Sequence, residues 1–253
     1  MLQVEHLTKR YGAMTAVDDL SFEIAGAGVY GFLGPNGAGK STTMNIMTGC
    51  LSATRGTVKI SGYDIYEEPR EAKRRVGYLP EQPPLYLGET PEEYLRFVGE
   101  ARGLRGAELK RQIASVIDET GIGDMKNRRI SALSKGYRQR VGIAQALLGE
   151  PDTVILDEPT VGLDPIQILE IRALIGQLGE SRTVLISSHI LSEVQTMCSR
   201  ILIISHGKLV AFDAPDALEA RLASPGEITV TAETDAASAE ALIAGIDGVS
   251  AVT

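Results

Sequence analysis

The sequence predicts an α/β protein built around a mostly parallel sheet. Short apolar segments that end in glycine or in acidic residues recur along the chain, and segments of helical periodicity separate most of them. Because a helix between two strands returns the chain alongside the first strand, we expect parallel pairing with right-handed crossovers. The 253 residues suffice for one large domain with a small appendage.

The composition points to a soluble globular protein in a reducing compartment. Asp and Glu (33) outnumber Lys and Arg (25), and the net charge of −8 argues against a free-standing nucleic-acid binder. No apolar stretch in the sequence approaches the ~18 residues that a membrane span requires. The polar N-terminus does not resemble a signal peptide. Cys50 and Cys198 are isolated in the sequence, and both are expected to be buried thiols.

The first eighty residues are expected to form strands and one helix. Residues 2–12 and 16–26 alternate between apolar and polar residues on either side of a Tyr-Gly turn, which predicts an antiparallel ribbon. Residues 28–34 form a short buried strand that ends in glycine, and residues 39–49 form a helix with apolar side chains available for burial. Within 56–80, GTVKISGYDI and RRVGYLP add two short strands.

Residues 83–128 differ from the rest of the chain. They are rich in Glu, Arg and Leu, and their apolar residues follow a helical period. The positions in this period are Tyr94, Leu95, Val98, Ala101, Leu109, Ile113, Val116 and Ile117. We therefore expect a helical subdomain inserted at about 83–150 into the strand-helix chain.

The strand-helix alternation resumes after this insert. TVILDEP (153–159) and TVLISSH (183–189) predict strands, IQILEIRALIGQLG (166–179) and ILSEVQTMC (190–198) predict helices, and 200–213 predicts a hairpin with a His-Gly turn.

The end of the chain predicts a separate small unit. EITVTAE, DAASAEALIAG and GVSAVT indicate a strand, a helix and a strand, a β-α-β module over 213–253 that follows a main domain over 1–212. Two strands and one helix form a marginal unit, so we expect the module to be incomplete or to be completed by another chain.

Residues 34–41 match the phosphate-loop pattern G-x-x-x-x-G-K-[ST] and lie between a predicted strand and a predicted helix. The three glycines of GPNGAGKS let successive backbone amides point at one anion, and the helix N-terminus adds its positive dipole end. Lys40 is expected to reach the outer phosphates, and the Ser41 hydroxyl to bind Mg²⁺. The alternative is a glycine-rich turn with a chance Lys-Ser, which the strand-loop-helix context disfavours.

Two adjacent carboxylates, Asp157 and Glu158, follow an apolar run at a strand end, where α/β sheets bind their ligands. We expect Asp157 to hold the magnesium shell through water and Glu158 to act as general base on the attacking water, which favours hydrolysis. Without the phosphate loop, solvated charges at a strand end would be a substantial alternative for this pair. His189 ends another apolar strand, where a lone histidine is commonly structural, but beside a phosphate loop its place favours contact with the γ-phosphate.

These motifs, in this order, resemble the nucleotide-binding subunit of an ATP-binding-cassette (ABC) transporter. The resemblance covers roughly residues 1–212 and rests on GPNGAGKST, YLPEQ, LSKGYRQR, VILDEP, GLD and SSH. It implies a P-loop NTPase core with a RecA-like parallel sheet, an N-terminal antiparallel β subdomain, an inserted helical subdomain and a small C-terminal α+β module. It implies Tyr11 stacking on adenine, where the alternative is local packing of a strand-turn aromatic. The residues that it implies for binding ATP with Mg²⁺ are Gly34, Pro35, Asn36, Gly37, Ala38, Gly39, Lys40, Ser41 and Thr42.

LSKGYRQRVGIAQALL resembles the family signature, whose usual form is Leu-Ser-Gly-Gly-Gln. Ser134 is expected to cap the N-terminus of a helix, and Gly136, which has no side chain, leaves the backbone beside the cap exposed. The serine hydroxyl and the free amides would then form a second phosphate site. The resemblance implies that this site serves the ATP of another subunit in a head-to-tail dimer, with Asp164 at the interface. Lys135 replaces the first glycine of the signature and Tyr137 replaces its glutamine.

A further departure concerns YLPEQ. Glu81 stands where the family usually has glutamine, and Gln82 follows it. Either residue is a candidate for contact with the magnesium site, and the position favours Glu81.

The resemblance implies a membrane permease as partner, docked near Pro83, Pro84 and Tyr86. The chain would then lie in the cytoplasm on the inner face of the cell membrane, without entering the bilayer. The variant motifs resemble subunits of drug, gliding-motility or natural-product efflux systems.

Two other classes of function fit less well. A soluble ABC ATPase acting on ribosomes or nucleic acid usually has two cassettes or a long coiled-coil insertion, whereas this sequence has one phosphate loop and no heptad run. A phosphate-loop kinase or GTPase leaves LSKGYRQR unexplained, and the missing Asn-Lys-x-Asp element favours adenine over guanine.

Overall fold

The computed structural model describes residues 1–222, 236–244 and 246. A six-stranded sheet runs in the order β10-β9-β3-β8-β7-β6, and all neighbours pair in parallel except β9 and β10, which form the predicted hairpin. The predicted parallel sheet is therefore confirmed, and its inner strands are buried on both faces, as parallel strands usually are. The strands are β3 (Gly28–Leu33), β6 (Val76–Leu79), β7 (Thr153–Leu156), β8 (Thr183–Ser188), β9 (Arg200–Ser205) and β10 (Lys208–Asp213).

A second, antiparallel sheet has the order β2-β1-β4-β5. The predicted ribbon of β1 and β2 is confirmed, and Gly12 at its turn has a φ of +59°, which glycine adopts readily. The strands are β1 (Leu2–Tyr11), β2 (Met14–Ile24), β4 (Arg55–Ile60) and β5 (Tyr63–Asp64).

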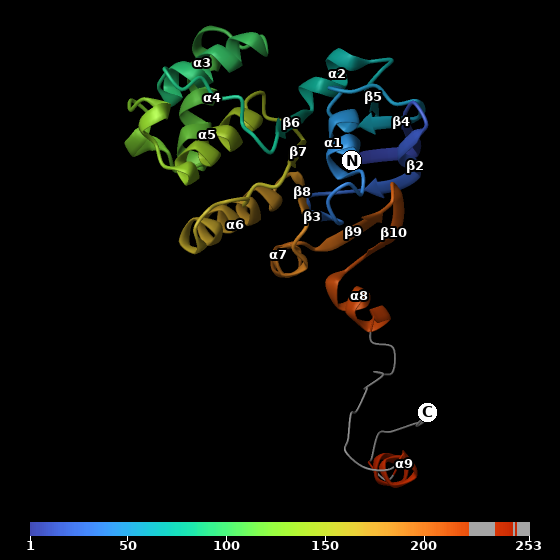
Figure 1. Cartoon of the computed structure of the whole chain (residues 1–253). Helices are drawn as coiled ribbons and strands as arrows, with labels where there is room; N and C mark the ends of the chain where they lie inside the picture. The colour runs from blue at the N-terminus through green and yellow to red at the C-terminus, as the bar shows by residue number, and fades with distance from the viewer. Residues whose placement is uncertain (223–235, 245, 247–253) are drawn as a thin grey trace. The chain divides into compact units, whose positions relative to one another are not determined.

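Helices cover the parallel sheet and form the expected insert between β6 and β7. Helices α3, α4 and α5 pack against one another on one side of the parallel sheet, and the antiparallel sheet lies on the other (Figure 1). The helices are α1 (Lys40–Met47), α2 (Pro69–Arg74), α3 (Pro91–Ala101), α4 (Gly106–Glu119), α5 (Lys135–Leu147), α6 (Pro165–Gly179), α7 (Leu191–Met197), α8 (Pro215–Leu222) and α9 (Ala236–Ala244), with 3-10 turns η1 (Gly123–Met125) and η2 (Ile130–Ala132).

Two hydrophobic clusters hold these layers together. One lies between the parallel sheet and the helices and includes Leu95, Ile143 and Leu156. The other lies between the two sheets around α1 and includes Phe32 and Met44. The predicted apolar face of α1 is thus confirmed, because its methionine and isoleucine side chains are fully buried.

The parallel register aligns the strand ends that matter for function. Leu33 pairs with Ser188, and Leu79 pairs with Leu156, so β3, β6, β7 and β8 all finish at one edge of the sheet. The loops that follow these strands therefore meet there, as the sequence patterns predicted.

The expectation that both cysteines are buried is wrong for one of them. Cys198 is buried as predicted, but Cys50 is exposed. The reason is local: α1 ends at Met47, and Gly49 adopts a left-handed φ of +68°, so the chain leaves the core before Cys50.

The chain divides into two compact units, Met1–Leu218 and Glu219–Thr253. The first unit extends past residue 212 because Leu218 of α8 packs in the cluster between the sheet and the helices. In the second unit, the predicted helix is confirmed as α9, and the strands predicted at EITVTAE and GVSAVT lie outside the described residues. Within the described ranges, no helix has the length and apolar character to cross a bilayer.

Candidate active site

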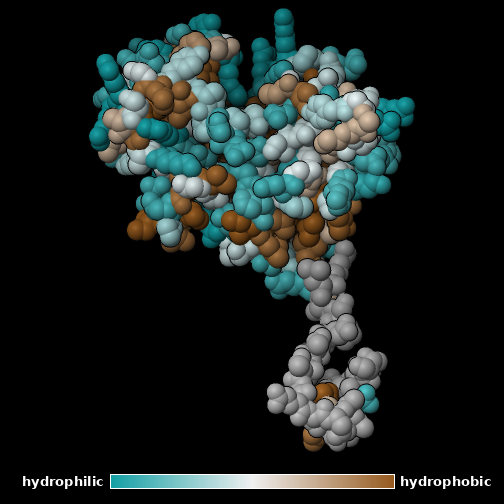
Figure 2. Space-filling model, in the orientation of Figure 1, coloured by the Kyte–Doolittle hydropathy of each residue, from teal (hydrophilic) through white to brown (hydrophobic). Residues whose placement is uncertain are grey.

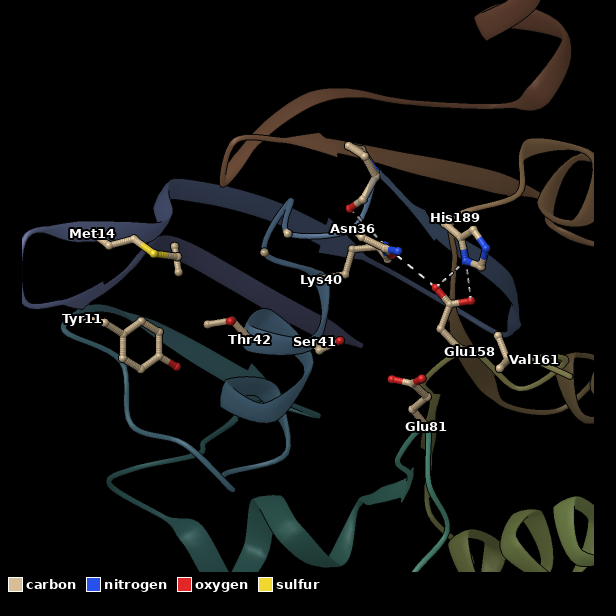
Figure 3. Close-up of a pocket in the computed structure, with 14 residues that line it drawn as sticks. Tyr11, Met14, Asn36, Lys40, Ser41, Thr42, Glu81, Glu158, Val161 and His189 are labelled. Carbon is tan, nitrogen blue, oxygen red and sulfur yellow. Dashed lines mark hydrogen bonds and ion pairs between the residues drawn. The ribbon is translucent and has the colours of Figure 1, made fainter.

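A cavity of about 400 Å³ opens where the aligned strand ends meet α1 (Figure 3). It lies between the loop after β3, the start of α1 and the loops after β6, β7 and β8. The residues that line it are Tyr11, Met14, Ala16, Pro35, Asn36, Gly37, Gly39, Lys40, Ser41, Thr42, Glu81, Glu158, Val161 and His189.

The loop after β3 needs glycine for two different reasons. Gly39 has a φ of +104°, and an added Cβ would lie 2.5 Å from the carbonyl oxygen of Ala16, so a larger residue is excluded both by conformation and by space. Gly34 packs closely against Ile204, and a Cβ added to Gly34 would collide with the carbonyl oxygen of Ile204. Gly34 and Ala38 do not line the cavity, although both were expected to contact nucleotide.

Lys40 is buried at the base of the cavity, with 5% of its surface exposed. Its Nζ donates to the carbonyl oxygens of Gly34 (2.6 Å) and Pro35 (3.3 Å) and lies 3.9 Å from Glu158 Oε1. An ammonium group fixed in this way presents positive charge where the amides of the loop converge, which suits a phosphate.

One hydroxyl contacts both acidic residues after β7. Ser187, on the neighbouring strand β8, donates from Oγ to Asp157 Oδ1 at 2.5 Å and accepts from the Glu158 backbone N–H at 2.7 Å. The Asp157 N–H donates to the carbonyl oxygen of Leu79 at 2.8 Å. Asp157 itself is buried and does not line the cavity, whereas Glu158 does.

Glu158 occupies an unusual backbone conformation, with a φ of +48°. Such a conformation is costly for a residue with a Cβ and is retained where the surroundings impose it. The turn directs the Glu158 carboxylate into the cavity, where His189 Nδ1 lies 3.0 Å from Oε2 and 3.2 Å from Oε1 (Figure 3). The structure thus brings together Lys40, Glu158 and His189, three residues predicted from separate motifs.

The YLPEQ segment contributes its glutamate. Glu81 lines the cavity and its carboxylate points toward it (Figure 3), whereas Gln82 is exposed outside the lining. At the far end of the cavity, Tyr11 and Met14 lie at the β1-β2 turn with 48% and 63% of their surfaces exposed, so a flat ring could pack against them. The Lys9 Nζ lies 5.1 Å from the centre of the Tyr11 ring.

A second cavity, of about 270 Å³, contains the predicted residues Ser134, Gly136 and Asp164 and shares no residue with the first. Its lining consists of Ser134, Gly136, Tyr137, Arg140, Asp164, Ile166, Gln167 and Glu170. Ser134 is the N-cap of α5, as predicted, and its Oγ accepts from the Tyr137 N–H at 3.3 Å. Asp164 caps α6 in the same way, accepting from the Gln167 N–H at 2.9 Å. Two helix N-termini therefore open into one cavity.

The two unusual residues of the signature have distinct surroundings. Tyr137 is half-buried, and its hydroxyl donates to Asp124 Oδ2 at 2.9 Å. This hydrogen bond raises the pKa of the Tyr137 phenol. The exposed Lys135 extends to Gly162, in the loop between Glu158 and Asp164. Both side chains thus link the start of α5 to neighbouring loops.

Sequence reasoning missed a buried carboxylate, Glu193 of α7. Its Oε2 accepts from Thr160 Oγ1 at 2.9 Å and from Ser188 Oγ at 3.1 Å, and its Oε1 lies 3.7 Å from Arg172. Thr160 follows Glu158 and Ser188 precedes His189, so Glu193 ties together the two loops that bear these side chains. The available signal in the sequence was its position: Glu193 lies four residues after His189, in a short helix that directly follows the predicted site.

The predicted partner-contact residues lie at the other end of the YLPEQ loop. Pro83 packs near Gly142 of α5, and the Pro84 carbonyl accepts from Tyr94 at 3.4 Å. Tyr86 is 51% exposed and its ring contacts the rings of Tyr94 and Phe97, with centroids 5.8 Å and 5.2 Å away.

The comparisons with known proteins agree with this geometry. Residues 17–161 match the family model described as ABC transporter. The linearmycin resistance ATP-binding protein LnrL of Bacillus subtilis (strain 168) is 37% identical over 232 residues, 91% of this chain and 75% of that protein. The bacitracin transport ATP-binding protein BcrA of Bacillus licheniformis is 39% identical over 212 residues, 83% of this chain and 68% of that protein.

Among solved structures, the dimeric ABC transporter cassette MJ0796 is 25% identical, with a TM-score of 0.76 over 85% of this chain and 99% of that chain. The matched region contains the phosphate loop, the signature segment and the carboxylates after β7. The chain belongs to the ABC transporter family, as an ATP-binding subunit that hydrolyses ATP.

Proposed function

We propose that ATP is hydrolysed between two copies of this chain, or between it and a homologous subunit, arranged head to tail. The observation that supports this most directly is the division of the predicted nucleotide contacts between two cavities with no common residue. The phosphate-loop cavity has the cation and the carboxylates, and the cavity at Ser134, Gly136 and Asp164 has helix N-termini. A partner's second cavity placed over the first would surround the γ-phosphate with donors.

In this proposal, Glu158 is the general base of hydrolysis. Its carboxylate lines the cavity and would accept a proton from a water molecule aligned with the γ-phosphate. Lys40 would neutralise charge on the outer phosphates. His189, in contact with Glu158, would orient that carboxylate and donate toward the γ-phosphate. The phosphate accepts the water oxygen while the bond to ADP breaks, and the proton moves to Glu158.

The oxygen ligands present here fit Mg²⁺. Ser41 and Glu81 line the cavity, and Asp157 directly precedes Glu158. Among the described residues only Oδ1 of Asp157 is hydrogen-bonded, to Ser187, so Oδ2 would be the oxygen that bonds to a water ligand of the ion. Among the described residues, no cluster of three or more His, Cys, Asp or Glu could hold a metal alone. This suits Mg²⁺, which is commonly bound by one or two protein oxygens together with phosphate oxygens and waters. When bound, the ion would neutralise charge on the β- and γ-phosphates.

We further propose that the chain acts with a membrane permease on the inner face of the cell membrane and supports export of antibiotic-like compounds. The named relatives concern linearmycin resistance and bacitracin transport, which supports this class over a role on ribosomes or nucleic acid. Tyr11 would stack on adenine, and the exposed aromatic cluster at Tyr86 would contact the permease near Pro83 and Pro84.

Mixing two inactive variants tests the shared site. We expect Lys40→Ala and Ser134→Arg to be inactive alone, because each removes one half of both composite sites in a dimer. A mixed dimer retains one intact site, formed by Lys40 of one subunit and Ser134 of the other. The mixture should therefore recover up to about a quarter of the wild-type ATPase rate, given random pairing and independent sites. Activity no higher than that of either variant alone contradicts the arrangement.

A further inference from the structure

A third cavity, of about 340 Å³, lies on the antiparallel sheet and shares no residue with either nucleotide-related cavity. We call it the sheet cavity. Its lining comes from β1, β2 and β4 and consists of His6, Thr8, Arg10, Asp18, Asp19, Arg55 and Gly56. Figure 2 shows mostly hydrophilic residues at the outer edge of this face, where Figure 1 places β2 and β4. The volume lies at the lower end of the range for small-molecule sites, about 300–1,000 Å³, so the cavity suits a small polar ligand.

Two irregularities in the pairing of β1 coincide with the sheet cavity. The pairing with β2 shifts register between Leu7 and Lys9, and the pairing with β4 shifts between Glu5 and Thr8. Thr8 lies within both irregular stretches. Such bulges interrupt the hydrogen-bond ladder and re-aim side chains, and they are common beside functional sites.

Two residues of the lining have a left-handed backbone. The φ angles are +51° at His6 and +54° at Asp19, which are uncommon values for residues with a Cβ. The His6 N–H donates to Ser21 Oγ at 2.8 Å, and the His6 Nδ1 lies 2.8 Å from Asp19 Oδ1. Gly56 packs against the same turn of chain, since an added Cβ would lie 2.4 Å from the His6 carbonyl oxygen. Conformations of this kind cluster at ligand sites, so their occurrence at two facing residues indicates more than an ordinary strand surface.

The charged groups of the sheet cavity are unequally partnered. Lys208 Nζ lies 3.2 Å from Asp18 Oδ2, and the Asp19 carboxylate contacts the His6 ring. Within the described part of the chain, neither the Arg10 nor the Arg55 guanidinium has a hydrogen bond or an ion pair. Both carboxylates are therefore engaged, whereas both guanidiniums are available to a ligand.

Thr8 adds a buried hydroxyl with a proton to donate. Only 9% of the Thr8 surface is exposed, and Oγ1 accepts from the Asp19 N–H at 3.2 Å. The hydroxyl donates to no acceptor among the described residues. A hydroxyl has one proton to donate, so Thr8 can donate to a ligand while it accepts from Asp19.

A phosphate monoester matches this donor set better than a carboxylate does. The monoester has three terminal oxygens and a charge of about −1.5 to −2 at pH 7. Each guanidinium can donate to two of these oxygens, and the hydroxyl to one. A carboxylate has two oxygens and one charge, which a single arginine satisfies. A cation would meet two unpaired guanidiniums.

We propose that the sheet cavity binds the phosphate monoester group of a small molecule. Arg10 and Arg55 supply the charge, and the Thr8 hydroxyl supplies a further hydrogen bond. The site is distinct from the phosphate loop, and the proposal does not depend on the head-to-tail arrangement. The monoester group can belong to a free metabolite or to a lipid headgroup, and the experiment distinguishes these two sources.

Isotope labelling of histidine tests the proposal in the full chain. The sequence has three histidines, of which His6 lines the sheet cavity and His189 lines the first cavity. NMR records the ring signals at fixed pH and ionic strength, and the variant His6→Gln assigns the His6 signal. Saturating Mg-ADP occupies the phosphate loop, and the His189 signal reports any further binding there. The probes are inorganic phosphate and glycerol 1-phosphate, with acetate as the carboxylate control.

We expect both phosphate probes to move the His6 signal to a saturating value while the His189 signal stays constant. Acetate should bind at least about tenfold more weakly, because it has one charge and lacks the third oxygen.

Substitutions identify the groups that bind. Arg10→Gln with Arg55→Gln should weaken phosphate binding by at least about tenfold. Thr8→Val should weaken it by about threefold or more. Both arginines are exposed, so their variants give the decisive result if the buried Thr8→Val change disturbs folding. The matched control Arg128→Gln, at an exposed arginine of the helical insert, should change the affinity by less than about twofold.

Vesicles distinguish the two sources of the phosphate group. Phosphatidic acid has a phosphate monoester headgroup, and phosphatidylcholine vesicles are the control. Sedimentation with phosphatidic acid vesicles that the double arginine variant abolishes would assign a lipid headgroup. Binding of glycerol 1-phosphate without such sedimentation would assign a free molecule.

Three results would overturn the proposal. The first is a His6 signal that neither phosphate probe moves, together with no sedimentation on phosphatidic acid vesicles. The second is acetate binding as tight as phosphate binding, and the third is wild-type affinity in the double arginine variant. ATPase activity restored in the mixing experiment alongside any of these results would reject this inference alone.

Discussion

Ser187 shows how one small side chain can set the geometry of a site. Its hydroxyl bonds both to the Asp157 carboxylate and to the Glu158 backbone N–H, and it sits on the strand next to theirs. The Glu158 backbone at a φ of +48° needs such support. The sequence predicted the two carboxylates from their position after an apolar run, but it did not predict Ser187, because that contact depends on the register of β7 against β8.

Replacing Ser187 should therefore impair catalysis more than binding. We expect Ser187→Ala to lower kcat for ATP hydrolysis by about tenfold, or about 1.4 kcal/mol in the barrier, while the Kd for ATP changes by less than about twofold. Ser181→Ala, exposed beyond the other end of β8, is the matched control and should leave both quantities unchanged. A Ser187→Ala enzyme with wild-type kcat would show that the carboxylates hold their positions without this hydroxyl.

The two cysteines should differ sharply in reactivity. Burial raises the pKa of the Cys198 thiol to about 12, so at about pH 8 it remains protonated and inaccessible, whereas Cys50 is exposed. We expect N-ethylmaleimide to modify one thiol in the native chain, at Cys50, and both in denaturant. Peptide mass spectrometry locates the label, and native modification of Cys198 would contradict the packing described around α7.

At the scale of elements, α7 positions the loops that precede it. Glu193 accepts hydrogen bonds from Thr160 and Ser188 and lies near Arg172 of α6. Local patterns predicted each of the elements involved, β7, β8, α6 and α7, because their apolar periods are continuous. The network between them was not predicted, since a lone glutamate in a helix is usually a solvated charge.

Removing the Glu193 carboxylate should loosen both loops. We expect Glu193→Ala to lower kcat by about tenfold and to destabilise the fold by about 1–3 kcal/mol, because buried hydroxyls lose their acceptor. Glu193→Gln should be intermediate in both respects, since its amide oxygen still accepts but no longer attracts Arg172. Ser192→Ala, exposed on the same helix, is the control. Unfolding melts and steady-state ATPase assays measure the two effects; a loss of stability without any loss of kcat would limit Glu193 to a structural role.

At the scale of the whole molecule, the sequence predicted the order of strands and helices and most of the residues that meet at the sheet edge. It failed where tertiary packing decides, as at Cys50, whose exposure follows from the way α1 ends.

The central proposal is that Glu158 is the general base for hydrolysis of an ATP held between two subunits, and Glu158→Gln tests it most directly. The amide cannot accept the proton of the attacking water, so hydrolysis should slow by about 10²–10⁴-fold while ATP binding persists. The variant should then accumulate as an ATP-bound dimer, seen as a doubling of mass by light scattering when ATP is added. Near-normal turnover would contradict the role of Glu158, and a monomer that retains ATP would contradict the shared site.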